Sequence, residues 1–258
     1  VKLSPEQVVL PDETITQIVR AYTREAGVRE LNRQIGRTVR KCAVHFAEGR
    51  TESVTVSAEQ LSELLGPERF AVEKLREILT PGVTTGLAWT EAGGDVLFVE
   101  AVLTPGGKGL MLTGQLGEVM KESAQTALSY IWSQAEQLGI EPEKFLDSGV
   151  HVHAPAGAIP KDGPSAGVTM ATSMVSLFTQ RPVRSDTAMT GEITLAGLVL
   201  PIGGIKEKVL AALRIGITRI ILPDANTRDL EEIDEHLRRQ IEFVPVKHLR
   251  EVFQAAIT

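Results

Sequence analysis

A single serine, Ser165, stands where a loop rich in proline and glycine turns into helical sequence. The loop at residues 160–167 reads PKDGPSAG, and an apolar, strand-like run leads into it. We expect a helix from Ser165 to about residue 180, so that the hydroxyl lies at a helix N-terminus, where free N–H groups and the dipole favour negative charge. Such a place would stabilise an alkoxide or a tetrahedral oxyanion. The simpler interpretation is that Asp162 and Ser165 only cap the helix, as both residue types do.

A serine hydroxyl needs a neighbouring base to become a nucleophile, and histidine is one class of candidate. The histidines are His45, His151, His153, His236 and His248. The first belongs to a separate helical block, and the last two lie in charged, helix-like sequence. His151 and His153 point to one side of a strand. Their H-x-H spacing can hold a metal, but no third ligand is evident, so ordinary strand packing is the better interpretation and no metal site is expected.

Lysine is the other candidate base, provided that burial or positive potential disfavours its charged form. Residues 201–212 read PIGGIKEKVLAA and supply Lys206 and Lys208 near the start of a predicted helix. The helix dipole disfavours an ammonium group at that end. Apolar neighbours such as Ile205 and Val209 favour desolvation, but helical spacing does not choose between the two lysines.

Two other motif classes fit the sequence poorly. Residues 163–167 satisfy G-x-S-x-G, but a true nucleophile elbow turns directly from strand to helix, and Pro164 fixes an ordinary φ before the serine. We therefore discount an α/β-hydrolase. The order of catalytic residues along an α/β-hydrolase chain could still be met by Ser165, then Asp224 or Asp234, then His236 or His248. No G-x-x-x-x-G-K-[ST] sequence occurs, so these residues contain no P-loop.

Composition indicates an ordinary globular protein. The 258 residues are 43% hydrophobic and 23% charged, with a formal charge of −6, which argues against a nucleic-acid or anionic-membrane surface. One cysteine, Cys42, rules out an intramolecular disulfide and fits a reducing, cytoplasmic compartment. No apolar run is long enough to cross a bilayer. Because the first residue is Val1, we expect a piece of a longer chain.

The order of helical and extended patterns predicts two domains. Residues 1–66 read as a small all-α helical bundle, residues 67–85 as a linker, and residues 86–258 as one mixed α/β (α+β) domain, in which strands and helices interleave. Two hairpins are expected in the larger domain, one from residues 97–103 and 110–112 and one from residues 187–195 and 198–200. Later strands are expected at 219–223 and 241–244, and helices at 118–137, 165–180 and 205–214.

Several stretches together resemble the Lon protease family in its bacterial, ATP-dependent form. They are residues 160–167, TGEIT at 190–194, residues 201–208, TGLAWT at 85–90, GQLGEVMKES at 114–123 and HVH at 151–153. Residues 86–258 resemble the whole proteolytic domain, and the helical block resembles the small C-terminal subdomain of the family's AAA+ module. There GVREL at 27–31 matches the sensor-2 segment, so the resemblance implies that Arg29 approaches the ATP phosphates in a complete protein.

The resemblance also implies roles for individual residues. Ser165 matches the nucleophile and Lys208 the base, while Thr190 matches a threonine whose hydroxyl holds the lysine amine. Backbone N–H groups around Gly163 to Ser165, beside Pro164, are the candidate oxyanion hole. Residues that line or neighbour the family's site are Glu100, His151, His153, Lys161 and Asp162. An alkaline working pH follows, because the lysine must be deprotonated.

For function, the resemblance implies a serine endopeptidase with a Ser–Lys dyad that degrades unfolded or damaged proteins in a cytoplasmic hexameric ring. ATP and Mg would act in the full-length protein through Walker A and B motifs that these residues lack. No membrane or nucleic-acid partner is expected. Two alternatives stay open: an esterase that pairs Ser165 with a histidine, and a non-catalytic oligomerisation module.

Overall fold

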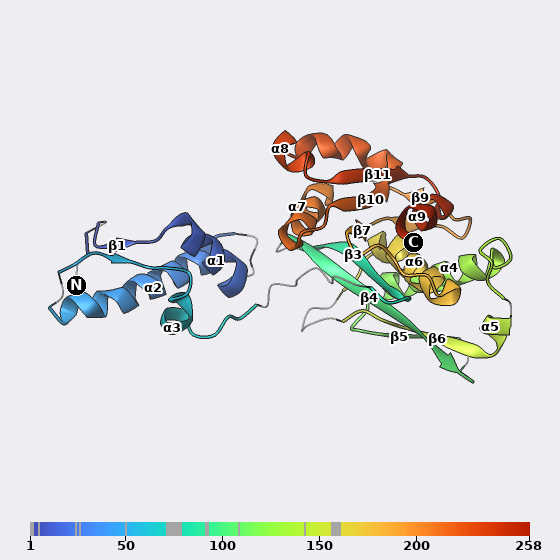
Figure 1. Cartoon of the computed structure of the whole chain (residues 1–258), viewed down its shortest axis with the longest axis horizontal. Helices are drawn as coiled ribbons and strands as arrows, with labels where there is room; N and C mark the ends of the chain where they lie inside the picture. Colours follow the sequence, from blue (N-terminus) through green and yellow to red (C-terminus); the bar gives the residue numbers. More distant parts are fainter. Residues whose placement is uncertain are drawn as a thin grey trace. The chain divides into compact units, whose positions relative to one another are not determined.

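The computed structural model divides into two compact units, residues 1–73 with 91–93 and residues 74–90 with 94–258 (Figure 1). It describes residues 3–4, 6–23, 25, 27–49, 51–70, 79–90, 93–107, 109–141, 143–155 and 161–258.

The first unit is mainly helical. Its elements are α1 (Asp12–Tyr22), α2 (Arg29–Ala47), α3 (Leu61–Leu65) and two short parallel strands, β1 (Val8–Val9) and β2 (Val54–Thr55). Apolar residues at helical spacing meet in one core, where Ile18, Tyr22 and Cys42 are buried. The prediction of a small helical domain is confirmed, and the two-stranded sheet is an addition to it.

A seven-stranded mixed sheet forms the centre of the second unit, with the order β11-β10-β7-β3-β4-β6-β5. Its strands are β3 (Val83–Thr90), β4 (Gly93–Pro105), β5 (Leu110–Thr113), β6 (Ser148–His153), β7 (Thr187–Met189), β10 (Arg219–Pro223) and β11 (Glu242–Val246). The strands β3, β7, β10 and β11 run parallel, whereas β6 is antiparallel to β4 and parallel to β5. The predicted mixed α/β class is confirmed.

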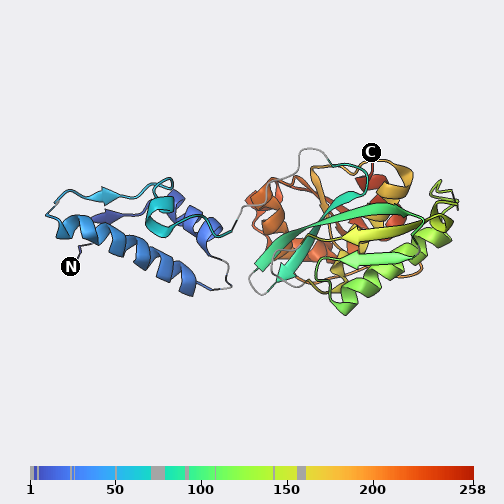
Figure 2. The same cartoon turned by 90° about the horizontal axis from the view of Figure 1, so that it is seen from below.

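Helices pack against both faces of this sheet, but Figure 2 looks onto a part of one face where the strands lie in front of the helices. They are α4 (Glu118–Ser133), α5 (Glu143–Leu146), α6 (Gly167–Thr179), α7 (Ile205–Ile215), α8 (Glu235–Arg238) and α9 (Leu249–Ala256), with 3-10 segments η1 (Pro164–Ala166) and η2 (Asp224–Glu232). Every residue of helix α6 from Gly167 to Phe178 is buried, including its serines and threonines. It is therefore the rigid element onto which the serine loop is attached.

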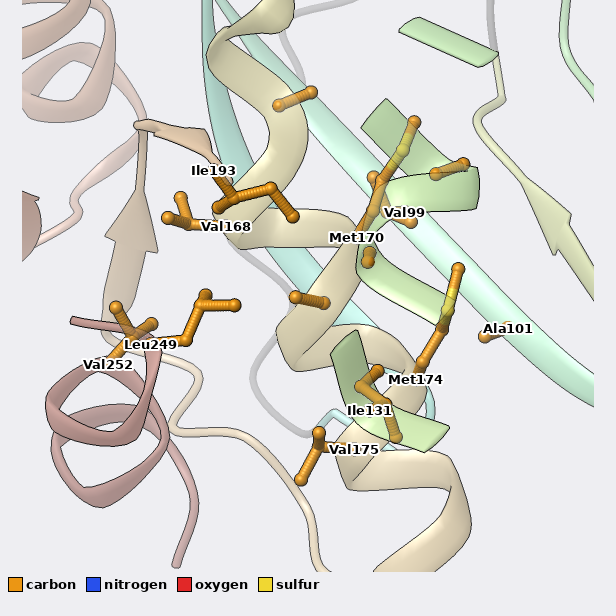
Figure 3. Close-up of a cluster of buried hydrophobic side chains, with 14 of the residues drawn as sticks. Val99, Ala101, Ile131, Val168, Met170, Met174, Val175, Ile193, Leu249 and Val252 are labelled. Carbon is orange, nitrogen blue, oxygen red and sulfur yellow. The ribbon is translucent and has the colours of Figure 1, made fainter. Parts of the chain in front are cut away.

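Alternation along the strands explains the two layers of helices. On β4, Leu97 and Val99 belong to the core shared with α4, α6 and α9, whereas Val96 and Phe98 belong to the core shared with α7. Successive strand side chains point to opposite faces, so a strand that is apolar at every position is buried on both. Figure 3 shows part of the first core, with side chains from the sheet, α4, α6 and α9.

The prediction of a hairpin from residues 97–103 and 110–112 is wrong. Strand β6 lies between β4 and β5, with Glu100 opposite His153 and Leu110 opposite Val150. Strand β6 carries Val150 and Val152, which are 3% and 0% exposed, and a buried strand needs backbone partners on both sides. Pairing between sequence neighbours is common but not obligatory.

The second predicted hairpin is correct only at its tip. Strands β8 (Glu192–Ile193) and β9 (Val199–Leu200) pair antiparallel, but residues 187–189 belong to the main sheet as β7. In the predicted linker, residues 71–78 lie outside the described residues, and β3 already begins at Val83. Within the described part of the chain, no helix is both long and apolar enough to span a membrane.

Candidate active site

Ser165 is the central residue of the 3-10 turn η1, which continues directly into α6. Its side chain is half-buried. The turn starts at Gly163 with φ of 119°, in the region that favours glycine, because a side chain there would be strained. The helix-capping interpretation is not supported, since neither η1 nor α6 receives a side-chain cap.

Asp162 caps a different helix from the one that follows it. Its Oδ1 atom accepts hydrogen bonds from the N–H of Met120 in the first turn of α4 (3.1 Å) and from the N–H of Gly163 (2.9 Å). A Cβ on Gly117 would lie 2.4 Å from the Asp162 Oδ2 atom, so a glycine is required for this approach. Asp162 therefore fastens the serine loop to the start of α4.

Lys208 lies in the first turns of α7 and is only 2% exposed. Its Nζ donates to the Thr190 hydroxyl at 3.1 Å. Burial lowers the pKa of Lys208 from 10.5 to about 8, and the nearby Glu207 carboxylate opposes that shift. Lys206, two residues earlier, is exposed. The structure therefore separates two lysines that helical spacing left equivalent, and only Lys208 has the environment of a general base.

Thr190 connects the lysine to the serine turn. Its Oγ1 atom lies 3.3 Å from the Ser165 carbonyl oxygen and 3.4 Å from the Leu87 carbonyl oxygen of β3. The Ser165 carbonyl also accepts the N–H of Gly191 at 2.9 Å. Thr190 can thus donate its proton to a backbone carbonyl while its oxygen accepts from Lys208, which fixes the amine beside the serine turn.

The two proposed reacting groups are not hydrogen-bonded to each other in this conformation. Within the described residues, the Ser165 hydroxyl has no hydrogen bond to the Lys208 amine. Proton transfer therefore requires a side-chain rotation or a bridging water, a small change that substrate binding commonly brings about.

In the predicted oxyanion-hole region, Gly163 to Ser165, one backbone N–H remains free to donate to a substrate oxygen. Pro164 has no N–H, and the N–H of Gly163 is already bonded to Asp162. The N–H of Ser165 has no acceptor within the described residues, so it is the donor that this loop can offer.

The remaining predicted site residues support neighbouring strands and loops. The Thr113 hydroxyl lies 2.9 Å from Nε2 of His151 and 2.7 Å from Nδ1 of His153, and Glu100 is the register partner of His153. Lys161 donates through Nζ to the Pro155 carbonyl at 2.6 Å. No cluster of metal-ligating side chains occurs among the residues that the structure describes. Thr113 could not be found from the sequence, because nothing in a single hydroxyl on a strand marks it.

The late histidines have other partners than Ser165. His248 accepts the N–H of Arg250 through Nδ1 (3.3 Å), and its Nε2 lies 3.1 Å from the Ala196 carbonyl oxygen. His236 is exposed, and its Nδ1 lies 3.2 Å from the Gln240 amide nitrogen. In the described part of the chain no histidine is hydrogen-bonded to Ser165, and, unlike Lys208, neither of these two histidines shares a hydrogen-bond partner with the serine turn.

Arg29 belongs to the first unit, where it opens α2 and is exposed. Exposure leaves its guanidinium accessible to an anion. Its predicted approach to ATP phosphates remains a prediction, because it depends on a part of the protein that these residues do not include.

Comparison with known proteins covers almost the whole chain. Residues 55–258 match the family model of the Lon protease C-terminal proteolytic domain, and residues 1–54 match that of the Lon protease AAA+ ATPase lid domain. A Lon protease of Nitrosococcus oceani is 62% identical over 99% of this chain and 33% of its own length. Lon proteases of Methylocella silvestris and Dictyoglomus thermophilum are 56% and 54% identical over 98% and 99% of this chain.

The chain spans about a third of the length of these curated relatives, since it covers 33%, 31% and 32% of them. The matches extend through the serine loop, Thr190 and α7, which are the elements that the geometry brings together. The chain belongs to the Lon protease family.

Proposed function

We propose that this chain carries the proteolytic site of an ATP-dependent serine endopeptidase, with Ser165 as nucleophile and Lys208 as general base. The observation that carries the proposal is the state of Lys208: an amine 2% exposed, bonded to Thr190, with its pKa lowered to about 8. A surface lysine is almost fully protonated at neutral pH, whereas this one releases its proton in a range where enzymes work.

The reaction follows from these positions. The neutral Lys208 amine takes the proton of the Ser165 hydroxyl as Oγ forms a bond to the peptide carbonyl carbon, and the carbonyl electron pair moves to its oxygen. The Ser165 N–H stabilises that oxyanion. When the C–N bond breaks, the Lys208 ammonium returns the proton to the leaving nitrogen. Water, deprotonated by the same amine, then attacks the acyl-enzyme ester. As the ester C–O bond breaks, the Lys208 ammonium returns the proton to the Ser165 Oγ, which leaves the acid, free Ser165 and a neutral amine.

Thr190 keeps the amine in place through both proton transfers. Its hydroxyl accepts a hydrogen bond from Lys208 in the neutral and in the charged form, because both forms have N–H donors. The matching of Ser165, Thr190 and Lys208 to catalytic roles rests on this geometry together with the family resemblance.

The substrate class and assembly are part of the same proposal. The relatives' name, Lon protease, supports polypeptides as the substrate class. Unfolded chains as the preferred substrates and a hexameric ring in the complete protein are proposed from the family resemblance. ATP and Mg would bind through the Walker A and B motifs, which these residues lack, and Arg29 would lie near the ATP phosphates. A cytoplasmic location remains the expectation from composition.

The test is hydrolysis of an unstructured fluorogenic peptide without ATP, from about pH 6 to 10, by the parent chain and by Lys208→Ala. Cleavage by the parent alone, rising with pH, supports the dyad. Lys206→Ala is the matched control, because it removes a lysine of the same helix that is exposed. Equal cleavage by Lys208→Ala and the parent would show that lysine is not the base.

One further variant tests the nucleophile that the Ser–Lys and Ser–His mechanisms share. Ser165→Ala should abolish both peptide cleavage and labelling by a serine-directed sulfonyl fluoride. Undiminished turnover in that variant would remove Ser165 from the mechanism, and a parent chain that assembles but neither cleaves nor reacts would favour the oligomerisation module.

A further inference from the structure

Strand β3 contacts the helix that carries Lys208 with two residues of the same face. Leu87 and Trp89 are two positions apart, so their side chains project to one side of the sheet. Leu87 is 2% exposed and belongs to the core shared with Ile205 and Val209 of α7. Trp89 lies nearer the strand end and is 56% exposed, although it is the larger apolar side chain.

The Trp89 side chain packs directly on Gly204. A Cβ added to Gly204 would lie 2.8 Å from Trp89 Cγ and Cδ1, a distance that real contacts do not show. Gly204 has φ of 70° and is the N-cap residue of α7. Its carbonyl accepts the backbone N–H of Lys208 at 3.1 Å. The indole therefore rests on the residue that closes the helical turn ending at Lys208.

A second contact comes from the start of β4. A Cβ on Gly94 would lie 1.9 Å from the Glu207 carbonyl oxygen and 3.0 Å from the Lys208 backbone nitrogen. The Gly94 carbonyl also accepts a hydrogen bond from Arg214 of α7 at 3.0 Å. Strand β3 thus contacts Gly204, and strand β4 contacts the backbone of Glu207 and Lys208. The backbone of the first turn of α7 therefore has little freedom to move.

The same strand also contacts the partner of the amine. The Leu87 carbonyl oxygen lies 3.4 Å from the Thr190 hydroxyl that accepts from Lys208. Strand β3 therefore contacts both members of the Lys208–Thr190 pair. The Leu87 carbonyl lies next to the Thr190 hydroxyl, and the Trp89 ring packs on Gly204 at the start of the helix that carries Lys208.

We propose that Trp89 is a positioning residue for Lys208: by covering Gly204 it fixes the first turn of α7 and thereby the place of the amine beside Thr190 and Ser165. This inference rests on the proposed Ser–Lys chemistry. A planar ring with two rotatable bonds suits the role, because it loses little freedom when it packs on a bare α-carbon.

The competing use of Trp89 is contact with the substrate peptide, since more than half of the ring is exposed. Small sulfonyl fluorides distinguish the two roles, because they report the nucleophilicity of Ser165 without occupying a peptide site. The rate constant of sulfonylation and its pH midpoint should therefore be measured beside kcat and KM for the fluorogenic peptide.

The variants are Trp89→Ala, Trp89→Leu and Trp89→Phe. Loss of the ring should lower the sulfonylation rate constant and kcat by about tenfold or more, since small misplacements of catalytic groups are costly. The midpoint should move to higher pH, because looser packing admits water to the amine. Trp89→Phe should recover most of both rates, and KM should stay within about twofold in all three variants.

Trp132→Ala is the matched control. Trp132 is 55% exposed, like Trp89, but it stacks on Phe145 with ring centroids 5.4 Å apart, away from α7. It should leave the sulfonylation rate and midpoint unchanged. Thermal unfolding identifies a variant that fails to fold, and Trp89→Leu, which keeps an apolar side chain, then carries the measurement.

Each remaining outcome has a defined meaning. If Trp89→Ala and Trp89→Leu react with the sulfonyl fluoride at the parent's rate and midpoint, the positioning role is wrong, and a raised KM would then assign Trp89 to substrate contact. If the parent itself neither reacts nor cleaves peptide, the proposed function fails and this inference fails with it.

Discussion

Replacement of Lys208 by methionine should stabilise the second unit at neutral pH while abolishing its proposed chemistry. The folded chain keeps this amine in an apolar surrounding, so the pKa of Lys208 drops from 10.5 to about 8. That drop corresponds to about 3 kcal/mol, at about 1.4 kcal/mol per pKa unit. Methionine has a similar length and flexibility without the charge, and it removes the cost of burying an ammonium.

The sign of the pH dependence follows from proton binding. Below about pH 8 both the folded and the unfolded chain hold the Lys208 proton, and the full cost opposes folding. Between about pH 8 and 10.5 the unfolded chain binds more protons, so the free energy of unfolding rises with pH. Above 10.5 the amine is neutral in both states and the cost is gone.

One loss offsets part of the gain. The Thr190 hydroxyl, which is 1% exposed, no longer receives the donor at 3.1 Å, and a lost buried hydrogen bond costs about 1 kcal/mol. We therefore expect Lys208→Met to raise the free energy of unfolding by about 2 kcal/mol at pH 7 and to lose that advantage as pH approaches 10.5.

Urea unfolding followed by tryptophan fluorescence measures this effect. The chain has two tryptophans, Trp89 and Trp132, and both lie in the second unit, so the signal reports that unit alone. Lys206→Met is the control, because an exposed lysine should change stability by less than about 0.5 kcal/mol. A Lys208→Met variant that is less stable than the parent at pH 7, or an advantage that does not vary with pH, would refute the reasoning.

Three further predictions concern the surroundings of the site. Asp162→Asn should lower the free energy of unfolding by about 1 kcal/mol and slow peptide cleavage, because the weakened acceptor holds both α4 and the serine loop; unchanged urea midpoint and kcat would contradict this. Thr190→Val should lower kcat by about tenfold or more and move the rising limb of the pH profile, whereas Thr190→Ser should keep both, and equal profiles for the two variants would speak against a role of the hydroxyl. Gly86→Ala should destabilise by about 1–3 kcal/mol in thermal unfolding, since its Cβ would lie 2.7 Å from the Thr169 hydroxyl, and an unshifted melting curve would show that Thr169 can move aside.

Local sequence was sufficient for most elements near the site. The strand leading to the loop is β6, the helix after Ser165 is α6, and the helix with the two lysines begins at Ile205 as expected. Each has a strong periodicity or a glycine or proline at its ends, and such signals act within a few residues.

The pairing of strands could not be predicted from neighbouring residues alone. Nothing within residues 97–112 shows that β6 inserts between β4 and β5, because the choice depends on a strand that begins at Ser148. The free energy that decides such pairing comes from burial of both faces of the sheet, which is a property of the whole unit.

The partner of Asp162 was hidden for the same reason. A carboxylate before a helix predicts a cap of that helix, but its acceptor atom reaches the Met120 N–H, which is 42 residues away. The resemblance to Lon proteases placed Asp162 near the site, and the tertiary structure supplied a physical role for it.

By itself, the sequence narrowed the candidate reactive groups to a serine in a loop that ends at a helix and, as its base, two lysines in the first turn of another helix or one of the histidines. Only the tertiary structure decided which lysine has lost its solvent. Lys206 and Lys208 have the same helix dipole and nearly the same neighbours in sequence, but one faces water and the other faces Thr190. Desolvation depends on what packs against a side chain from distant segments, here β3 and the turn after β7, and that packing sets the pKa on which the proposed chemistry depends.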